Sequence, residues 1–224
     1  NDSLFFSPKP DVFITQGTKY LRALKKIFPN NKIHAVGSFK LDLAKFKFNE
    51  SLIKKKVFKS EKKIKQKKII SICTAINDER NIINFLNKCD LSNFLVIICP
   101  HPYYKKESMI KFENYFKHNF KVFENLSTRE IISISDFVIC GQSSVGFEAL
   151  LNKIKVIRLL DDSFPPNYDL NDGITVIKDY KKLNTYLNKK FSFSKSFTKK
   201  IEKSFFYKFD NKTYLRFWKI LNKI

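Results

Sequence analysis

Short apolar runs alternate with helical patterns between residues 67 and 178, and this alternation constrains the fold more than any other feature of the sequence. The apolar runs occupy residues 69–75, 94–99, 120–123, 136–140, 155–160 and 174–177. Strands that are apolar throughout and separated by helices belong to parallel sheets that are covered on both faces. The sequence therefore predicts an α/β fold with a doubly wound, Rossmann-like parallel sheet.

Helical patterns fill the gaps between these runs, at residues 79–86, 106–117, 128–134 and 144–151. Ser127 and Glu130 have the spacing of a capping box at the start of the third of these helices. Two more helices are predicted at 180–190 and 197–222. The aromatic residues of the last one have near-helical spacing, which is typical of a buried core face.

The N-terminal part of the chain has its own strand–helix–strand unit. Residues 11–15 and 32–36 are apolar runs, and the amphipathic pattern between them ends at Pro29. Residues 39–66 are rich in Lys and contain neither Gly nor Pro. We therefore divide the chain into the end of a second α/β domain at 1–38, a Lys-rich linker at 39–66, and a main domain at 67–224.

The first candidate site motif is Pro100-His101-Pro102, which ends a central apolar run. In doubly wound sheets, ligands bind at the carboxyl ends of the strands. Proline on both sides holds the backbone near extended values, so the imidazole of His101 would face the ligand crevice in a fixed position. There it can donate a hydrogen bond to a phosphate. A histidine that merely packs or caps is the alternative.

The second motif starts at Gly141 and Gln142, after the run at 136–140, and continues with Ser143 and Ser144 at the start of a helix. Free backbone N–H groups and the helix dipole favour an anion at such a point, and two hydroxyls add donors. Glu148 lies about one turn further along the helix, where it could accept from a ribose hydroxyl pair. An ordinary serine N-cap with Glu148 on a solvated face is the alternative.

Together, the His-Pro and Ser-Ser elements resemble those of bacterial GT-B sialyltransferases, polysialyltransferases and Kdo-type transferases, which use CMP-sugars. CDP-glycerol glycerophosphotransferases have similar elements. Residues 11–42, including Val36-Gly37-Ser38, resemble the close of the N-terminal domain of these enzymes and the crossing into the second domain. The resemblance covers nearly the whole chain, although only the two motifs are specific to it.

The resemblance implies a metal-independent glycosyltransferase with a CMP-sugar donor, which carries a Kdo, sialic or other nonulosonic residue, or with a CDP-alcohol donor. The acceptor would be a glycan or a lipid-linked glycan of the bacterial surface, such as capsule or lipopolysaccharide. His101, Pro102, Ser143 and Ser144 would bind the phosphate and stabilise it as it leaves. The general base of such enzymes comes from an acidic motif in the N-terminal domain, which this segment lacks. No separate cofactor is implied.

Weaker candidates follow other strands of the predicted sheet. Thr74 and Asn77 come after the run at 69–75, and simple capping is their alternative role. Glu124 and Asn125 come after the run at 120–123 and could meet the base of a nucleotide, or form a plain turn. The adjacent acids at 161–162 resemble a metal pair, but neighbouring side chains on an extended chain point apart. No metal site is predicted.

A formal charge of +22 indicates anionic partners: nucleic acid, an anionic membrane face or phosphorylated substrates. An AT-rich genome would also produce much of the Lys excess. No RRM, KH, helix-turn-helix or zinc-finger signature is present, so no nucleic-acid partner is expected. The lysines of 53–68 and 181–203 suit peripheral contact with the inner face of an anionic membrane, or a solvated surface.

The cysteines and the lack of a long apolar stretch indicate in which cellular compartment the protein resides. Cys73, Cys99 and Cys140 lie in apolar runs, and with Cys89 they form no CxxC pair. Buried free thiols and a reducing compartment are therefore predicted, with neither zinc nor disulfides. No apolar stretch reaches the ~20 residues of a membrane span, and we expect a cytoplasmic protein. The first residue is Asn, which suggests a piece of a longer chain.

Overall fold

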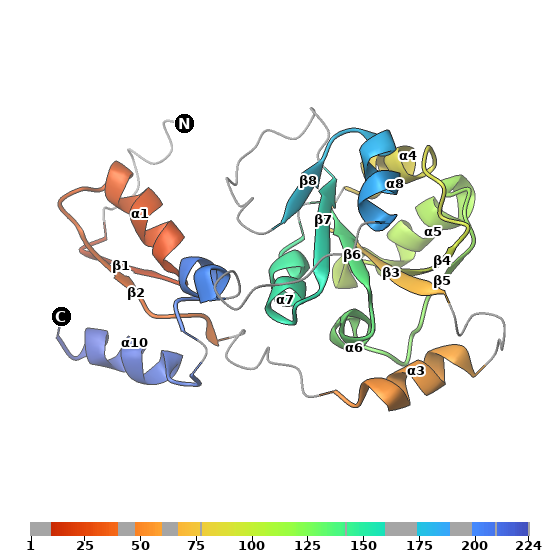
Figure 1. The fold of residues 1–224 in the computed structure, drawn as a ribbon. Helices are drawn as coiled ribbons and strands as arrows, with labels where there is room; N and C mark the ends of the chain where they lie inside the picture. Colours follow the sequence, from red (N-terminus) through yellow and green to blue (C-terminus); the bar gives the residue numbers. More distant parts are fainter. Residues whose placement is uncertain are drawn as a thin grey trace. The chain divides into compact units, whose positions relative to one another are not determined.

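The computed structural model describes residues 10–39, 48–59, 67–76, 78–141, 143–159, 174–188, 199–208 and 210–223. The chain forms two compact units, of which one comprises residues 1–45 with 195–224 and the other residues 46–194. The larger unit contains a six-stranded sheet, and the smaller contains a two-stranded one (Figure 1). None of the helices in the described ranges is long and apolar enough to cross a membrane.

The sheet of the larger unit is parallel throughout. Its strands are β3 (Lys68–Cys73), β4 (Phe94–Cys99), β5 (Phe120–Lys121), β6 (Phe137–Cys140), β7 (Lys155–Leu159) and β8 (Thr175–Ile177). They lie in the order β5-β4-β3-β6-β7-β8, and every neighbouring pair is parallel. Within this unit the first strand in the chain is thus flanked by the second and the fourth, which is the doubly wound order. This confirms the predicted sheet.

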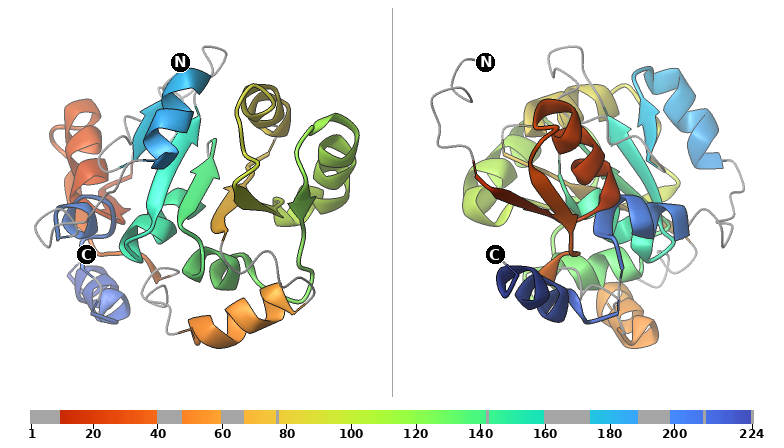
Figure 2. Two further views of the ribbon diagram at one scale, coloured as in Figure 1. Left: turned by 45° about the vertical axis from the view of Figure 1, so that its right-hand side comes forward. Right: turned by 90° about the vertical axis from the view of Figure 1, so that its left-hand side faces the viewer.

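Helices cover both faces of this sheet (Figures 1 and 2). One face carries α4 (Glu79–Leu86), α5 (Lys105–Tyr115) and α8 (Tyr180–Asn188), and Leu86, Phe112 and Leu183 belong to one core cluster with the strands. The other face carries α6 (Thr128–Ser133) and α7 (Val145–Leu151). These helices lie at the positions that the sequence predicts, because each combines an apolar face with a polar start.

Helix α6 shows how local sequence sets these boundaries. The Ser127 hydroxyl accepts from the Glu130 backbone N–H, and the Glu130 carboxylate accepts from the Ser127 backbone N–H at 2.8 Å. This confirms the predicted capping box. The hydrogen bond from the Ser127 backbone also lowers the pKa of Glu130, because it stabilises the ionised carboxylate.

Three of the cysteines form a row across the sheet. Cys73 of β3 is in register with Cys99 of β4 on one side and with Cys140 of β6 on the other. All are buried and free, as predicted, and so is Cys89. Burial raises the pKa of the Cys140 thiol to about 12, so this thiol is protonated at neutral pH.

The described part of the predicted linker contains a helix that belongs to the larger unit. Helix α3 (Glu50–Phe58) begins after Asn49, whose side chain accepts from the Leu52 backbone N–H. It contacts α6, and its Ile53 and Val57 are buried. Residues 48–59 are therefore anchored by two apolar side chains, a signal that the surrounding lysines obscure in the sequence.

The smaller unit begins with the predicted strand–helix–strand, formed by β1 (Val12–Thr15), α1 (Thr18–Ile27) and β2 (Lys32–Ala35), with the two strands parallel. Residues 199–223 belong to the same unit. The Thr18 hydroxyl donates to the Lys203 carbonyl at 3.1 Å, and Arg216 Nε donates to the Val36 carbonyl at 2.6 Å. The contacts thus divide the chain differently from the division predicted from the sequence, in which residues 67–224 formed the main domain.

The predicted single helix at 197–222 is wrong, because the chain breaks in its middle. A π-helical turn, η4 (Glu202–Phe206), ends at Tyr207, and α10 (Thr213–Leu221) begins after a turn. Tyr207 and Asn211 have φ angles of 67° and 56°, which no helix tolerates. Asp210 stabilises the turn, because its carboxylate accepts from the Lys212 backbone N–H and from Arg216.

Glu79 is a buried carboxylate at the start of α4, and it provides a test of the fold. Burial alone would raise its pKa, but hydrogen bonds from Ser108, its own backbone and Lys111 outweigh burial and lower the pKa. Its stabilising effect should therefore be complete above the unfolded pKa of ~4.3 and disappear as the pH falls through the folded pKa. We expect Glu79→Gln to lower the free energy of unfolding by about 1–3 kcal/mol at pH 7, and by less at pH 4.

Urea denaturation of both proteins at the two pH values measures this difference. A difference between wild type and variant that is the same at pH 4 and at pH 7 would show that the Glu79 charge contributes nothing to stability.

Candidate functional site

The candidate residues follow strands next to the point where the strand order of the sheet reverses, between β3 and β6. The chain passes from β3 to β4 on one side and returns to β6 on the other side of β3, so β3 and β6 are neighbours. Connections from two such strands leave toward opposite faces, and the crevice between them at the carboxyl end is the usual ligand site of open α/β sheets. The loops after β3, β4 and β6 all lie at this edge.

His101 directly follows β4, with extended backbone angles of φ −62° and ψ 133°. Pro102 then begins the 3-10 turn η3 (Pro102–Tyr104). The His101 N–H donates to the Thr74 hydroxyl at 3.1 Å, and the His101 carbonyl accepts from the Tyr104 N–H at 3.1 Å. Thr74 thus serves to fix His101 from the neighbouring strand.

The imidazole of His101 has a nitrogen with an unmet hydrogen-bonding capacity. Its Nδ1 is buried and has no hydrogen-bond partner among the described residues. The rings of Tyr103 and Tyr104 flank the imidazole, with centroids 5.8 and 6.2 Å away. Leaving a buried polar atom unpaired costs about 1–3 kcal/mol, so a ligand that pairs with Nδ1 would recover that cost.

Ser143 and Ser144 form the start of α7. Ser143 is buried, and its hydroxyl accepts from the Val145 N–H at 3.4 Å. Ser144 is exposed in the N-cap position, where its side chain makes no capping hydrogen bond. The predicted alternative of an ordinary serine cap therefore does not describe Ser144, whose hydroxyl remains open to solvent beside the first N–H groups of the helix.

Asp78 links two of these loops, and the sequence analysis missed it. Its side chain is buried and accepts from the Ala75 N–H at 2.8 Å. A Cβ placed on Gly141 would collide with the Asp78 carboxylate, whose Cγ would lie 3.0 Å away. Gly141 is therefore needed for close approach of the loops after β3 and β6. In the sequence, Asp78 looks like a plain N-cap residue ahead of α4.

Glu148 is buried, and its carboxylate forms an ion pair. It is 4% exposed, and its carboxylate pairs with Nε of Arg129, at the start of α6, at 2.9 Å. Arg129, which the sequence analysis did not single out, is partly exposed. Any ligand hydroxyl that reaches the Glu148 carboxylate would therefore meet an anion that Arg129 already orients.

A second basic residue that the sequence analysis missed lies under α7. Arg158 of β7 is in register with Cys140, is 4% exposed, and has its guanidinium carbon 5.8 Å from the centre of the Phe147 ring. Its Nε has no hydrogen-bond partner within the described ranges. A buried cation close to the first turn of α7 strengthens the local preference for an anion.

The other candidates lie outside this group or outside the described residues. Glu124 and Asn125 form an exposed turn after β5, where Glu124 pairs with Nζ of Lys105 at 3.0 Å. Asn77, Gln142 and the acids at 161–162 fall outside the described residues. Across the ranges that are described, no group of three or more His, Cys, Asp or Glu could hold a metal ion.

Comparison with known sequences gives no assignment. No protein-family model matches the chain, and no curated protein matches it.

Comparison with solved structures does find similar folds. A UDP-GlcNAc 2-epimerase from Methanocaldococcus jannaschii, in complex with UDP-GlcNAc and UDP, is 17% identical with a TM-score of 0.58, covering 96% of this chain and 61% of its own. The wall teichoic acid polymerase TagF, as a variant soaked with CDPG, is 15% identical with a TM-score of 0.54, covering 95% and 58%.

These likenesses concern the fold. Both proteins have the GT-B fold, which confirms the predicted fold class for this chain. The chain spans about 60% of the length of these structures, because it covers 58% of one and 61% of the other.

Proposed function

We propose that the chain carries the nucleotide-binding part of a glycosyltransferase that uses a CMP-activated sugar in the synthesis of a surface polysaccharide. The sugar would be Kdo, sialic acid or another nonulosonic acid, and the acceptor a glycan or lipid-linked glycan. One observation carries the proposal: the Nδ1 of His101, which has no partner among the described residues, and the open hydroxyl of Ser144 follow two strands beside the point where the strand order reverses. GT-B proteins with bound nucleotides support it by analogy.

In this proposal the phosphate of the donor lies between the His101 imidazole and the start of α7. When the glycosidic C–O bond breaks, negative charge grows on the CMP phosphate as it leaves. A ring N–H of His101, the Ser143 and Ser144 hydroxyls and the first N–H groups of α7 would donate to the phosphate and stabilise that charge. The positive charge of Arg158, beneath α7, would add to this stabilisation. The Arg129–Glu148 pair would bind the ribose hydroxyls.

CDP-glycerol transfer is the second candidate function. The TagF structure that was soaked with CDPG has a similar fold, and this observation favours a donor with two phosphates. In that reaction the bond that breaks is a phosphate anhydride bond, and CMP is again the leaving group. The same anchors would serve both reactions, so the chemistry of the phosphate alone does not separate them.

The proposal also covers the location of the enzyme, its need for a metal or cofactor, and the source of its general base. The enzyme would be cytoplasmic and would meet the inner membrane peripherally through its excess of basic residues, since the charge is +22. It would need neither a metal nor a separate cofactor. The general base would come from a part of the protein outside these residues.

A binding panel tests the proposal. We expect isothermal titration calorimetry at ~0.15 M salt, where long-range attraction by the net charge is screened, to show CMP or CDP binding at least ten-fold more tightly than UMP, UDP and GDP. The intact donors, a CMP-sugar and CDP-glycerol, then separate the two donor classes, because CMP is the product of both reactions. A preference for UDP or GDP would remove the cytidine assignment, and tightest binding by a single-stranded oligonucleotide would favour a nucleic-acid partner instead.

A further inference from the structure

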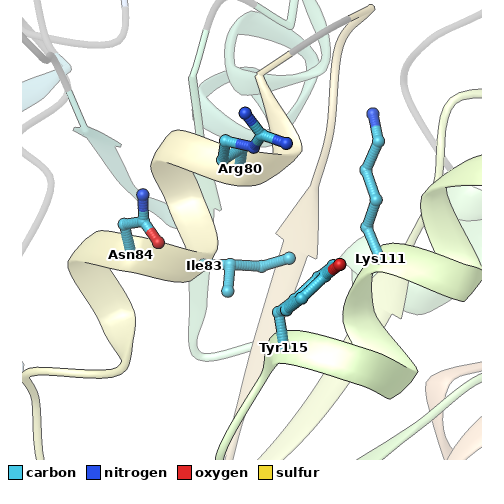
Figure 3. Close-up of a pocket in the computed structure, with 5 residues that line it drawn as sticks. All are labelled: Arg80, Ile83, Asn84, Lys111 and Tyr115. Carbon is cyan, nitrogen blue, oxygen red and sulfur yellow. The ribbon is translucent and has the colours of Figure 1, made fainter.

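A cavity of about 320 Å³ lies between α4 and α5, and no step of the proposed reaction uses it. Its lining residues are Arg80, Ile83, Asn84, Lys111 and Tyr115 (Figure 3). The volume is at the lower end of the range of ~300–1,000 Å³ that is usual for small-ligand sites. None of these lining residues is acidic.

One end of the cavity is basic. Figure 3 shows the side chains of Arg80 and Lys111 reaching toward the same end, from α4 and α5 respectively. Arg80 is exposed and makes no ion pair with any described residue. Its charge is therefore available to a ligand.

Lys111 is held in place by the carboxylate beneath it. Its Nζ lies 3.1 Å from Glu79, which is buried and whose lowered pKa keeps it ionised at neutral pH. The Glu79–Lys111 pair has no net charge, and the ammonium group keeps further N–H donors for a second acceptor. The net charge of this end is thus the one positive charge of Arg80.

The opposite end of the cavity is apolar. Ile83 is 2% exposed and forms its floor, and the ring of Tyr115 lies beside it (Figure 3). Tyr115 itself is 65% exposed, which is high for a large aromatic side chain with an apolar neighbour. Ile83 is already buried, so an apolar ligand group at this end would mainly remove the exposed surface of the Tyr115 ring from water.

We propose that this cavity binds a phosphate monoester with a short apolar chain. The phosphate would pair with Arg80 and Lys111, and the chain would cover Ile83 and Tyr115. A soluble phosphate monoester and the headgroup of phosphatidic acid in a membrane share this chemistry. The inference does not depend on the proposed transferase function, since none of these residues belongs to the loops after β3, β4 and β6 that would bind the donor.

Three probes separate the two ends of the cavity. We expect calorimetry to show that octyl phosphate, below its micellar concentration, binds at least ten-fold more tightly than inorganic phosphate or octyl glucoside, because only octyl phosphate fills both ends. Equal affinity for octyl phosphate and inorganic phosphate would overturn the proposal, because the apolar end would then contribute nothing.

Two variants and a matched control locate the binding. Arg80→Ala should weaken octyl phosphate at least ten-fold, and Tyr115→Ala should bring its affinity close to that of inorganic phosphate. Lys88→Ala removes an exposed cation from the region just after α4, outside the cavity, and should leave the affinity unchanged. Equal losses in Arg80→Ala and Lys88→Ala would mean general attraction to a basic protein, and would contradict the site. Unchanged thermal unfolding confirms that each variant folds.

Vesicle sedimentation identifies the source of the ligand. If the ligand is a membrane lipid, Arg80→Ala should bind vesicles that contain phosphatidic acid, whose headgroup is a phosphate monoester, less than Lys88→Ala does. If it is a soluble ester, the two variants should sediment equally while octyl phosphate still distinguishes them. If Arg80→Ala still binds both the vesicles and octyl phosphate as the wild type does, the proposal is refuted for the lipid and for the soluble ester.

Discussion

Gly141→Ala is expected to destabilise the protein by about 1–3 kcal/mol and to weaken nucleotide binding more than ten-fold. The added Cβ would collide with the Asp78 carboxylate. Asp78 cannot move aside cheaply, because it is buried and accepts from the Ala75 N–H. The loop after β6 must then shift, and Ser143 and Ser144 shift with it. Chemical denaturation and calorimetry with CMP measure the two effects.

Gly146→Ala is the matched control for this prediction. A Cβ at Gly146 would meet the Cys140 Sγ and a Val156 methyl group at 3.1 Å, so it requires a shift of only a few tenths of an ångström, less than the collision at Gly141 requires. Alanine inside a helix also gains up to ~1 kcal/mol over glycine. The two effects nearly cancel, so Gly146→Ala should unfold close to wild type and bind CMP normally. Equal losses in both variants would show that the Asp78–Gly141 contact has no special role.

Loss of His101 or Ser144 is expected to cost at least ten-fold in affinity for CMP. A hydrogen bond to a charged phosphate contributes about 1.5–3 kcal/mol, and each variant removes one. Removing the imidazole also deletes a buried nitrogen that pairs with none of the described residues, and Ser144 is exposed, so His101→Ala and Ser144→Ala should unfold almost like wild type. Calorimetry with CMP on the wild type, both single variants and the double variant gives a complete double-mutant cycle of binding free energies.

The double variant carries the sharper information. Two side chains that hold the same phosphate are coupled, so their losses should not simply add. Strict additivity would place His101 and Ser144 on separate ligand groups. Lys106→Ala, which removes an exposed cation in the first turn of α5, serves as a control for the general attraction of anions to a basic protein.

The fold could be predicted from sequence because its signals are local. The run at 94–99 is apolar throughout, and a short run of this kind, between helical patterns, is typical of a strand covered on both faces. The C-terminal helix was predicted wrongly, because aromatic spacing continues across the break. The positive φ angles at Tyr207 and Asn211 and the ion pair between Asp210 and Arg216 mark this break, and the spacing of apolar residues reveals neither.

The site could be predicted only in part. His101 and the serines are marked by proline and glycine neighbours, which act on the local backbone. Asp78 and Arg158 carry no such mark, because their roles depend on strand order. The contact between Asp78 and Gly141 exists because β3 and β6 are neighbours, although 63 residues separate the two positions. Arg158 lies between apolar residues of β7, and only its register with Cys140 places it beneath α7.

A crystal structure with bound CMP is the most direct test of the phosphate site. We expect the phosphate to lie within hydrogen-bond distance, about 3 Å, of the His101 imidazole and of the Ser143 or Ser144 hydroxyl, at the start of α7. A CMP phosphate held by other residues, with His101 Nδ1 still unpartnered, would contradict it.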